Sequence, residues 1–387
     1  NISPLFAMSG LTAIDLSNNA GINPIDLNPV LGQNVGLTRI GLAGIPVDLW
    51  SLPLYDASKG QPYALVELNL SNTLTSDINR LGEFPGLQIL NLSDNQIADV
   101  GVLGVLNNLR ELDLSNNQIV DIFPLSFFNG LTQLNLSNNA GINLNDLFPI
   151  LSQNVGLTHI GLGGISIVDL WSLPLFDPTS GQPYALVELD LSNTQISDIN
   201  RLNEFPGLQN LNLSGNQISD IFVLDMLNNL RQLDLSNNQI SSLSPLFTQI
   251  GLTQIDLSGN AGINPTELFP ILDQNRGLTK IGLAGIPVGD LWSLPLNDPF
   301  TGQPYALVEL NLSNTQISDI NRLAEFPGLQ VLKLSGNQIA DIFALDVMSN
   351  LRELDLSDNQ VGNISPLFAM SGLTAIDLSN NAGINPI

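Results

Sequence analysis

Residues 208–229 read LQNLNLSGNQISDIFVLDMLNN, and this stretch decides the fold. Its opening pattern, LxxLxLSxN, places leucines at positions 4 and 6 between polar residues at positions 3 and 5. Alternation with a period of two indicates a short strand with one buried face. The asparagine at position 9, Asn216, can satisfy backbone groups of a tight bend with its side-chain amide. The stretch therefore predicts a short strand, a bend, and an apolar segment that ends in a turn or short helix.

The same motif starts sixteen times along the chain, first at Leu11 and last at Leu373. The spacings are 26, 28, 22, 22 and 22 residues, and then 26, 29, 22, 22 and 22 residues twice over. A longer period of 120 or 121 residues therefore contains five repeats, and residues 131–251 differ from residues 252–372 at only 34 of 121 positions. One repeat cannot bury its leucines alone, so stacking is required.

We therefore predict one continuous solenoid over residues 1–387, without polar caps. Its parts are a partial repeat at 1–10, cassettes at 11–130, 131–251 and 252–372, and a partial repeat at 373–387. Residues 1–25 are identical to residues 363–387, and from this we expect the sequence to be a window of a longer array.

Ten asparagines at position 9 are predicted to form a structural ladder along the stack. They are Asn19, Asn95, Asn117, Asn139, Asn216, Asn238, Asn260, Asn337, Asn359 and Asn381. The 28- and 29-residue units carry isoleucine there (Ile45, Ile165 and Ile286), and the units after them carry threonine (Thr73, Thr194 and Thr315).

The pattern LxxLxLSxNxIxDIxPL resembles the leucine-rich repeat, and units such as NLSGNQISDIFVLDMLNN are similar to the bacterial internalin-type class. The resemblance implies an α/β solenoid with a parallel β-sheet on the concave face. It implies short 3₁₀ or α-helices, or extended turns, on the convex face. In NPTELFPILDQNRG, the pair Asn264 and Pro265 is typical of a helix start, so a short α-helix is expected there. A bacterial, extracellular or cell-surface location is the corresponding expectation.

Composition narrows the function. The chain has 11 Lys+Arg against 36 Asp+Glu, a net charge of −25, which disfavours nucleic acid and anionic membranes as partners. It has no cysteine and one histidine, His159, and no phosphate-binding loop or catalytic carboxylate pair is recognisable. No apolar run approaches the roughly 18 residues of a membrane span. We therefore expect no catalytic residues, no metal, no cofactor and no membrane insertion.

Positions 3 and 5 of the strands would face the concave side. Two interpretations remain open: an acidic surface that binds a partner, or a solvated face that keeps the solenoid soluble. The candidate binding residues are Arg39, Glu67, Glu111, Asp113, His159, Glu188, Asp190, Asp234, Asp256, Lys280, Glu309, Glu353 and Asp355.

The long units carry loops such as LPLFDPTSGQPYA, in which Asp-Pro-x-x-Gly predicts a turn. Their aromatic residues either contact a sugar or a neighbouring chain, or fill the extra volume of a longer repeat. These residues are Trp50, Tyr63, Trp171, Tyr184, Trp292 and Tyr305.

The favoured function is a non-enzymatic structural or assembly scaffold, part of a long repetitive surface or extracellular protein that could form fibres. Its partners would be further copies of the array or other proteins. The alternative is an internalin-like adhesin that binds a protein or glycan through the concave face.

Overall fold

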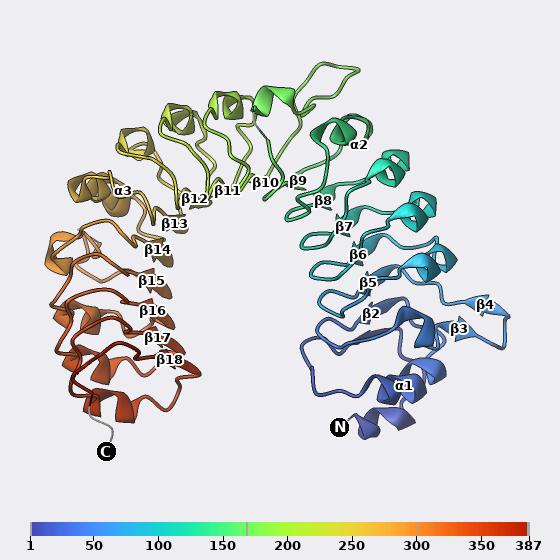
Figure 1. The fold of residues 1–387 in the computed structure, drawn as a ribbon, viewed down its shortest axis with the longest axis horizontal. Coiled ribbons are helices and arrows are strands. Elements are labelled where there is room, and N and C mark those ends of the chain that lie inside the picture. The colour runs from blue at the N-terminus through green and yellow to red at the C-terminus, as the bar shows by residue number, and fades with distance from the viewer. Residues whose placement is uncertain (1, 168, 299, 385–387) are drawn as a thin grey trace. The chain divides into compact units, whose positions relative to one another are not determined.

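The computed structural model describes residues 2–167, 169–298 and 300–384. The chain divides into two compact units, Asn1–Thr194 (unit 1) and Gln195–Ile387 (unit 2). Each unit is a stack of three-residue strands, one per repeat, that pair in parallel in chain order (Figure 1). In unit 1 the strands are β1 (Ala13–Asp15), β2 (Arg39–Gly41), β5 (Glu67–Asn69), β6 (Ile89–Asn91), β7 (Glu111–Asp113), β8 (Gln133–Asn135), β9 (His159–Gly161) and β10 (Glu188–Asp190). In unit 2 they are β11 (Asn210–Asn212), β12 (Gln232–Asp234), β13 (Gln254–Asp256), β14 (Lys280–Gly282), β15 (Glu309–Asn311), β16 (Val331–Lys333), β17 (Glu353–Asp355) and β18 (Ala375–Asp377).

The strands are kept in register by their central aliphatic residue. Leu112 of β7 aligns with Leu134 of β8, and both are buried. A slip of one residue would turn these leucines to solvent and polar side chains into the core, so one register is strongly favoured. Each fully buried leucine stabilises the fold by about 1.5–3 kcal/mol.

Helices lie on the side of each unit away from the strands (Figure 1). Most are short 3₁₀ turns, as Pro and Gly in these segments dictate. In unit 1 they are η1 (Ser3–Ala7), η2 (Pro24–Asp26), α1 (Leu27–Gln33), η3 (Leu49–Ser51), η4 (Asn79–Glu83), η5 (Gly101–Val105), η6 (Phe123–Phe127), η7 (Leu144–Asp146), α2 (Leu147–Gln153) and η8 (Leu170–Ser172). In unit 2 they are η9 (Asn200–Glu204), η10 (Phe222–Met226), η11 (Ser244–Leu246), η12 (Pro265–Glu267), α3 (Leu268–Gln274), η13 (Leu291–Ser293), η14 (Asn321–Glu325), η15 (Phe343–Val347) and η16 (Ser365–Ala369).

The short helix predicted in NPTELFPILDQNRG is confirmed. Asn264 caps η12 by accepting a hydrogen bond from the Thr266 amide at 3.1 Å, Pro265 is the first helical residue, and α3 follows directly. The α/β solenoid with its parallel strands is confirmed as well.

The loop of the first long unit forms a hairpin in which β3 (Tyr55–Asp56) pairs antiparallel with β4 (Gln61–Pro62). Asp56 lies at the turn and accepts hydrogen bonds from both the amide (2.9 Å) and the hydroxyl (2.6 Å) of Ser58. The second long unit has a single antiparallel bridge between Phe176 and Pro183 at the same place.

Candidate functional site

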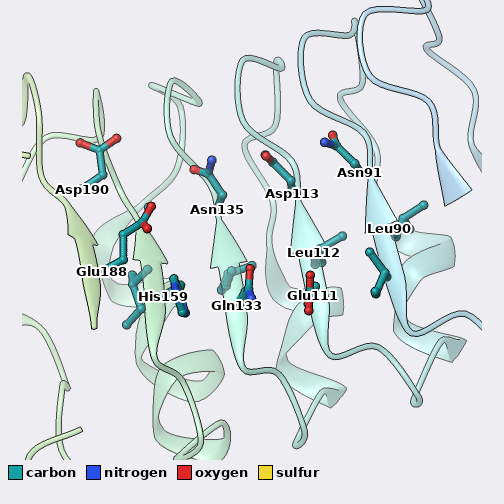
Figure 2. A pocket seen from close by; sticks show the side chains of 14 residues that line it. Leu90, Asn91, Glu111, Leu112, Asp113, Gln133, Asn135, His159, Glu188 and Asp190 are labelled. Carbon is teal, nitrogen blue, oxygen red and sulfur yellow. The ribbon is translucent and has the colours of Figure 1, made fainter. Parts of the chain in front are cut away.

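An open hollow of about 330 Å³ lies over strands β6 to β10 on the strand face of unit 1 (Figure 2). Because side chains alternate along a strand, the central residue of each strand points into the core and the two flanking residues point outward. The hollow is lined by Ile89, Leu90, Asn91, Glu111, Leu112, Asp113, Gln133, Leu134, Asn135, His159, Ile160, Gly161, Glu188 and Asp190.

Figure 2 shows the polar side chains in two rows. The row at position 5 is held by its own turn: Asp113 Oδ1 accepts hydrogen bonds from the amide (2.9 Å) and the hydroxyl (2.7 Å) of Ser115. The amide oxygen of Asn91 binds Ser93 in the same way, at 2.9 and 2.8 Å. These bonds use one oxygen of Asp113 and fix its carboxylate toward the hollow.

The row at position 3 contains His159 among the carboxylates of Glu111 and Glu188. His159 Nδ1 lies 2.8 Å from Thr158 Oγ1, and His159 faces Glu188 in register on β10. The same arrangement recurs in unit 2, where Lys280 Nζ lies 3.2 Å from Glu309 Oε1. The lining thus carries four carboxylates, of Glu111, Asp113, Glu188 and Asp190, and one imidazole, of His159.

Glycine at position 5 of β9 shapes one side of the hollow. A Cβ on Gly161 would lie 2.2 Å from Asn135 Oδ1, so the Asn135 side chain leans toward the glycine. Gly163 has a similar role, because its Cβ would lie 2.5 Å from Ser192 Oγ and 3.0 Å from Asp190 Oδ2. The missing side chains let Ser137 and Asp190 approach to 3.4 Å across β9.

A second open hollow of about 290 Å³ lies over β1, β2 and β5, and it is built in the same way. Gly41 takes the place of Gly161, and a Cβ there would lie 2.4 Å from Asp15 Oδ1. Arg39 takes the place of His159 and faces Glu67 in register.

The other concave-face candidates lie on the strands of unit 2. Asp234 and Asp256 are register partners on β12 and β13, and Glu353 and Asp355 lie on β17. Burial raises the pKa of Asp234, and the neighbouring charge of Asp256 raises it further, while hydrogen bonds from Ser236 and the charge of Lys280 act in the opposite direction.

The aromatic loop residues divide into two groups. Trp50, Trp171 and Trp292 are 52%, 58% and 55% exposed and lie on the 3₁₀ turns η3, η8 and η13. The three tyrosines are buried, so they do not offer a contact surface. Their hydroxyls donate to the carbonyls of α1, α2 and α3: Tyr63 to Leu31 (2.8 Å), Tyr184 to Leu151, and Tyr305 to Leu272 (2.6 Å).

The asparagines at position 9 after the first repeat bond backbone groups of two successive repeats, whereas Asn19 donates to the Leu16 and Ser17 carbonyls of its own repeat. Asn117 Nδ2 donates to the carbonyls of Leu92 (2.9 Å), Leu114 (3.0 Å) and Ser115 (3.1 Å), and its Oδ1 accepts from the Ile97 amide at 3.0 Å. Thr73 covers part of this role, since its hydroxyl donates to the Leu70 carbonyl at 2.8 Å.

Sequence reasoning missed two sets of buried polar residues. Asn34, Asn154 and Asn275 follow α1, α2 and α3; Asn154, for example, accepts from the Leu131 amide (2.9 Å) and donates to the Phe128 and Ile150 carbonyls (3.0 and 2.7 Å). Arg80, Arg201 and Arg322 are also buried. Arg80 donates to the carbonyls of Leu49 (2.7 Å) and Leu52 (2.6 Å), and its Nε lies 3.3 Å from Glu83. The recurring strings QNxGL and INRL were the available signals.

Two further observations apply to the described residues only. No group of three or more His, Cys, Asp or Glu side chains among them could hold a metal ion. In the same part of the chain, no helix has the length and apolar character needed to cross a membrane.

Sequence models of known protein families match the same repeats. A sequence model of "Leucine Rich repeats (2 copies)" matches residues 107–152, 185–227 and 306–346. Models of a single leucine-rich repeat match residues 87–106, 229–250 and 347–364. No curated protein matches the sequence.

Several solved structures are similar. An internalin (InlF) of Listeria monocytogenes is 27% identical over 82% of this chain and 81% of that chain, with a TM-score of 0.46. A leucine-rich-repeat protein of Leptospira interrogans is 21% identical over 97% and 98%, with a TM-score of 0.51. The ectodomain of the Arabidopsis receptor kinase HAESA, solved with a peptide hormone, is 18% identical over 95% and 62%, with a TM-score of 0.54. With leucine-rich-repeat matches in both units and a parallel one-strand-per-repeat fold, this chain is built of leucine-rich repeats and has the leucine-rich-repeat fold.

Proposed function

We propose that the chain is a non-enzymatic recognition scaffold whose strand face in unit 1 binds a cationic segment of a partner protein. The observation that carries this proposal is the hollow over β6 to β10, which is lined by four carboxylates and one imidazole. Opposite charges across an interface speed association and select the partner. The net charge of −25 favours the same class of ligand. A location at a bacterial surface, as the internalin resemblance implies, is part of this proposal.

The test is binding of a lysine-rich peptide to the full chain, measured by calorimetry at low salt. Asp113→Asn removes one charge from the hollow but keeps an acceptor for Ser115, as Asn91 does for Ser93. We expect it to weaken binding by about fivefold, equivalent to roughly 1 kcal/mol. Asp346→Asn, on the helix face at η15, removes the same charge and is the matched control. Equal losses in both variants would contradict a localised site, and binding of a neutral glycan instead would replace the proposed ligand.

A second function, self-assembly into a structural array, has its own supporting observation. An exposed tryptophan recurs at the same place in each cassette, and exposed tryptophan is enriched at protein interfaces. Sedimentation over a range of concentrations would detect assembly. Trp171→Ala should then shift the protein toward monomer, and a monomer at every concentration would contradict this role.

A further inference from the structure

The helix side of unit 1, away from the strands, carries an apolar patch on the two neighbouring short helices η5 and η6 (Figure 1). The η5–η6 patch is defined here as Val102, Gly104, Val105, Phe123 and Phe127. Val105, Phe123 and Phe127 are 56%, 61% and 57% exposed, and the two phenylalanine rings meet edge to face with their centroids 5.7 Å apart. A Cβ added to Gly104 would lie 3.2 Å from Phe127 Cδ2, so the Phe127 ring lies against the glycine. Contiguous exposed apolar side chains of this kind mark interaction surfaces.

The second cassette shows that the stack does not need an apolar surface at this place. The residue 121 positions after Gly104 is Asp225, and the residue 121 positions after Phe127 is Thr248. These two residues make a polar contact in unit 2, where the Thr248 hydroxyl donates to Asp225 Oδ1 at 2.6 Å. The third cassette also carries an aspartate there, Asp346. Unit 1 therefore has a glycine and an exposed phenylalanine where the same fold accepts a solvated polar pair, and a partner that covers the ring would account for the exchange.

Two carboxylates lie beside the η5–η6 patch. Asp99 and Asp121 are exposed and directly precede the first turns of the two helices, where Asp99 Oδ1 accepts from the Gly101 amide (2.8 Å) and Asp121 Oδ1 from the Phe123 amide (2.9 Å). Asp121 is particular to the first cassette, because Ser242 stands at the corresponding place in the second. Compared with unit 2, unit 1 has gained a carboxylate at the edge of the patch and lost one within it.

The charge around the patch points to a cationic partner. Residues 81–153 contain one basic residue, Arg110, and its guanidinium donates to the Gly130 carbonyl at 2.9 Å. The carboxylates of Asp99 and Asp121 thus attract positive charge from outside this part of the chain. A second copy of the chain is a poor match, because its net charge is −25 as well.

The arrangement of apolar and acidic groups fits one kind of segment. Val105 and Phe127 stand at equivalent positions of successive repeats, and so do Asp99 and Asp121, so an apolar row and an acidic row run side by side along the stack. An amphipathic helix lays its apolar face on such a surface and keeps its polar face alongside. We infer that the η5–η6 patch docks an amphipathic, cationic helix of a partner protein, with the helix's apolar side chains on the patch and its basic side chains beside the two aspartates. This site is separate from the hollow on the strand face.

The second cassette also supplies a variant that should fold. Gly104→Asp combined with Phe127→Thr recreates in unit 1 the pair that Asp225 and Thr248 form in unit 2. The helices η5 and η10 have the same length, so the exchange keeps the local framework. Phe343→Ser is the matched control, because it removes a 69% exposed phenylalanine from the helix side of unit 2. Asp113→Asn, in the hollow on the strand face, is the second control.

The probes are three peptides of about 18 residues, which is about five helical turns. The first has leucines on one helical face and lysines on the other, the second has the same composition in scrambled order, and the third has glutamate in place of lysine. Fluorescence anisotropy with the full chain at low salt measures their binding. We expect the first peptide to bind about tenfold more tightly than the scrambled one, which is the effect of one buried aromatic anchor. The double variant should abolish this advantage, whereas Phe343→Ser and Asp113→Asn should keep it.

Four results would overturn the inference. They are equal binding of the two lysine peptides, equal binding of the lysine and glutamate peptides, an advantage that survives in the double variant, and an advantage that Phe343→Ser removes equally. Loss of the advantage in Asp113→Asn alone would assign the peptide to the strand face, so this inference would fail and the proposed function would stand. Sedimentation of the wild type and Phe127→Thr tests the remaining occupant, since a dimer that the variant abolishes would assign the patch to a second copy.

Discussion

Asp234 is a residue at which charge and burial oppose each other. Its pKa is raised by burial and by Asp256, so the folded state holds the proton more tightly than the unfolded state does. The stability that comes from this proton is fully present below the unfolded pKa of about 3.9, and it is lost as the pH rises through the folded pKa. The ionised side chain is therefore a local cost at neutral pH.

We predict that Asp234→Asn raises the free energy of unfolding at pH 7, by about 1 kcal/mol or less. Asparagine keeps an acceptor for the Ser236 amide, as Asn212 does for Ser214 on the preceding strand. Urea denaturation at pH 7 and pH 3 measures the effect, which should vanish at pH 3. Asp113→Asn is the control, because its position-5 neighbours are Asn91 and Asn135. A gain of equal size at both pH values would contradict this explanation.

The stability that Tyr184 contributes also falls as the pH rises, but in the alkaline range. Burial, with a smaller contribution from Asp177, raises the pKa of Tyr184 to about 12. The stability from its neutral phenol is thus complete below the unfolded pKa of about 10, and it is lost as the pH rises toward the folded value. Tyr184→Phe should lower the free energy of unfolding at pH 8 by about 1–2 kcal/mol, because the buried Leu151 carbonyl loses its donor.

Denaturation midpoints at pH 8 and pH 11 test this prediction. The phenylalanine variant should lose less stability than the wild type between the two pH values. Tyr55→Phe, a substitution at an exposed tyrosine, is the control and should change neither midpoint. A pH profile that is identical for wild type and Tyr184→Phe would show that the buried phenol is not responsible.

At the scale of one repeat, the asparagine turn is the main polar element. Asn117→Ala would leave the Ile97 amide and three carbonyls without their partner, so we expect a loss of about 2–4 kcal/mol. Asn117→Thr should lose less, because Thr73 makes the equivalent bond to the Leu70 carbonyl in its own repeat. Chemical denaturation with circular dichroism provides the ranking. Equal losses for alanine and threonine would mean that the intra-repeat bond contributes nothing.

The repeat elements were largely predictable, and the polar core was not. In the stretch that begins at Leu208, Leu211 and Leu213 alternate with polar residues. This period of two fits an extended strand and not a helix. Arg80, by contrast, is buried because the neighbouring repeat places the carbonyls of Leu49 and Leu52 within reach, and the recurring string INRL marks the residue without showing that contact. Whether Trp171 fills the longer repeat or faces solvent depends on one short 3₁₀ turn. The sequence did not specify the direction of that turn, so both interpretations of the tryptophan remained open.

The candidate site was predictable in part for the same reason. Alternation along a strand was enough to place Glu111 and Asp113 together on one face. The role of Gly161 could not be predicted, because it depends on how the Asn135 side chain of the adjacent strand β8 lies over the glycine. That position is set by packing between strands and not by the local sequence.

At the scale of the whole molecule, the dominant property is the net charge of −25. Like charges repel one another in the compact state, and at moderate ionic strength salt screens this repulsion between charges more than about 8–10 Å apart. We predict that sodium chloride raises the thermal midpoint between about 10 and 300 mM, while it weakens binding of a cationic peptide. Differential scanning calorimetry and binding titrations over the same salt series measure the two trends. A midpoint that falls with salt would mean that attractive ion pairs, such as Lys280 with Glu309, outweigh the repulsion.

The bonds of Asn117 also have a direction along the chain. Its side chain completes groups of the preceding repeat, Leu92 and Ile97, which are synthesised before it. During translation, each repeat therefore waits for the next one to leave the ribosome before its last buried amides and carbonyls find partners. The growing end of the nascent solenoid is always one repeat short of complete, and chaperones would meet it there rather than along the finished stack.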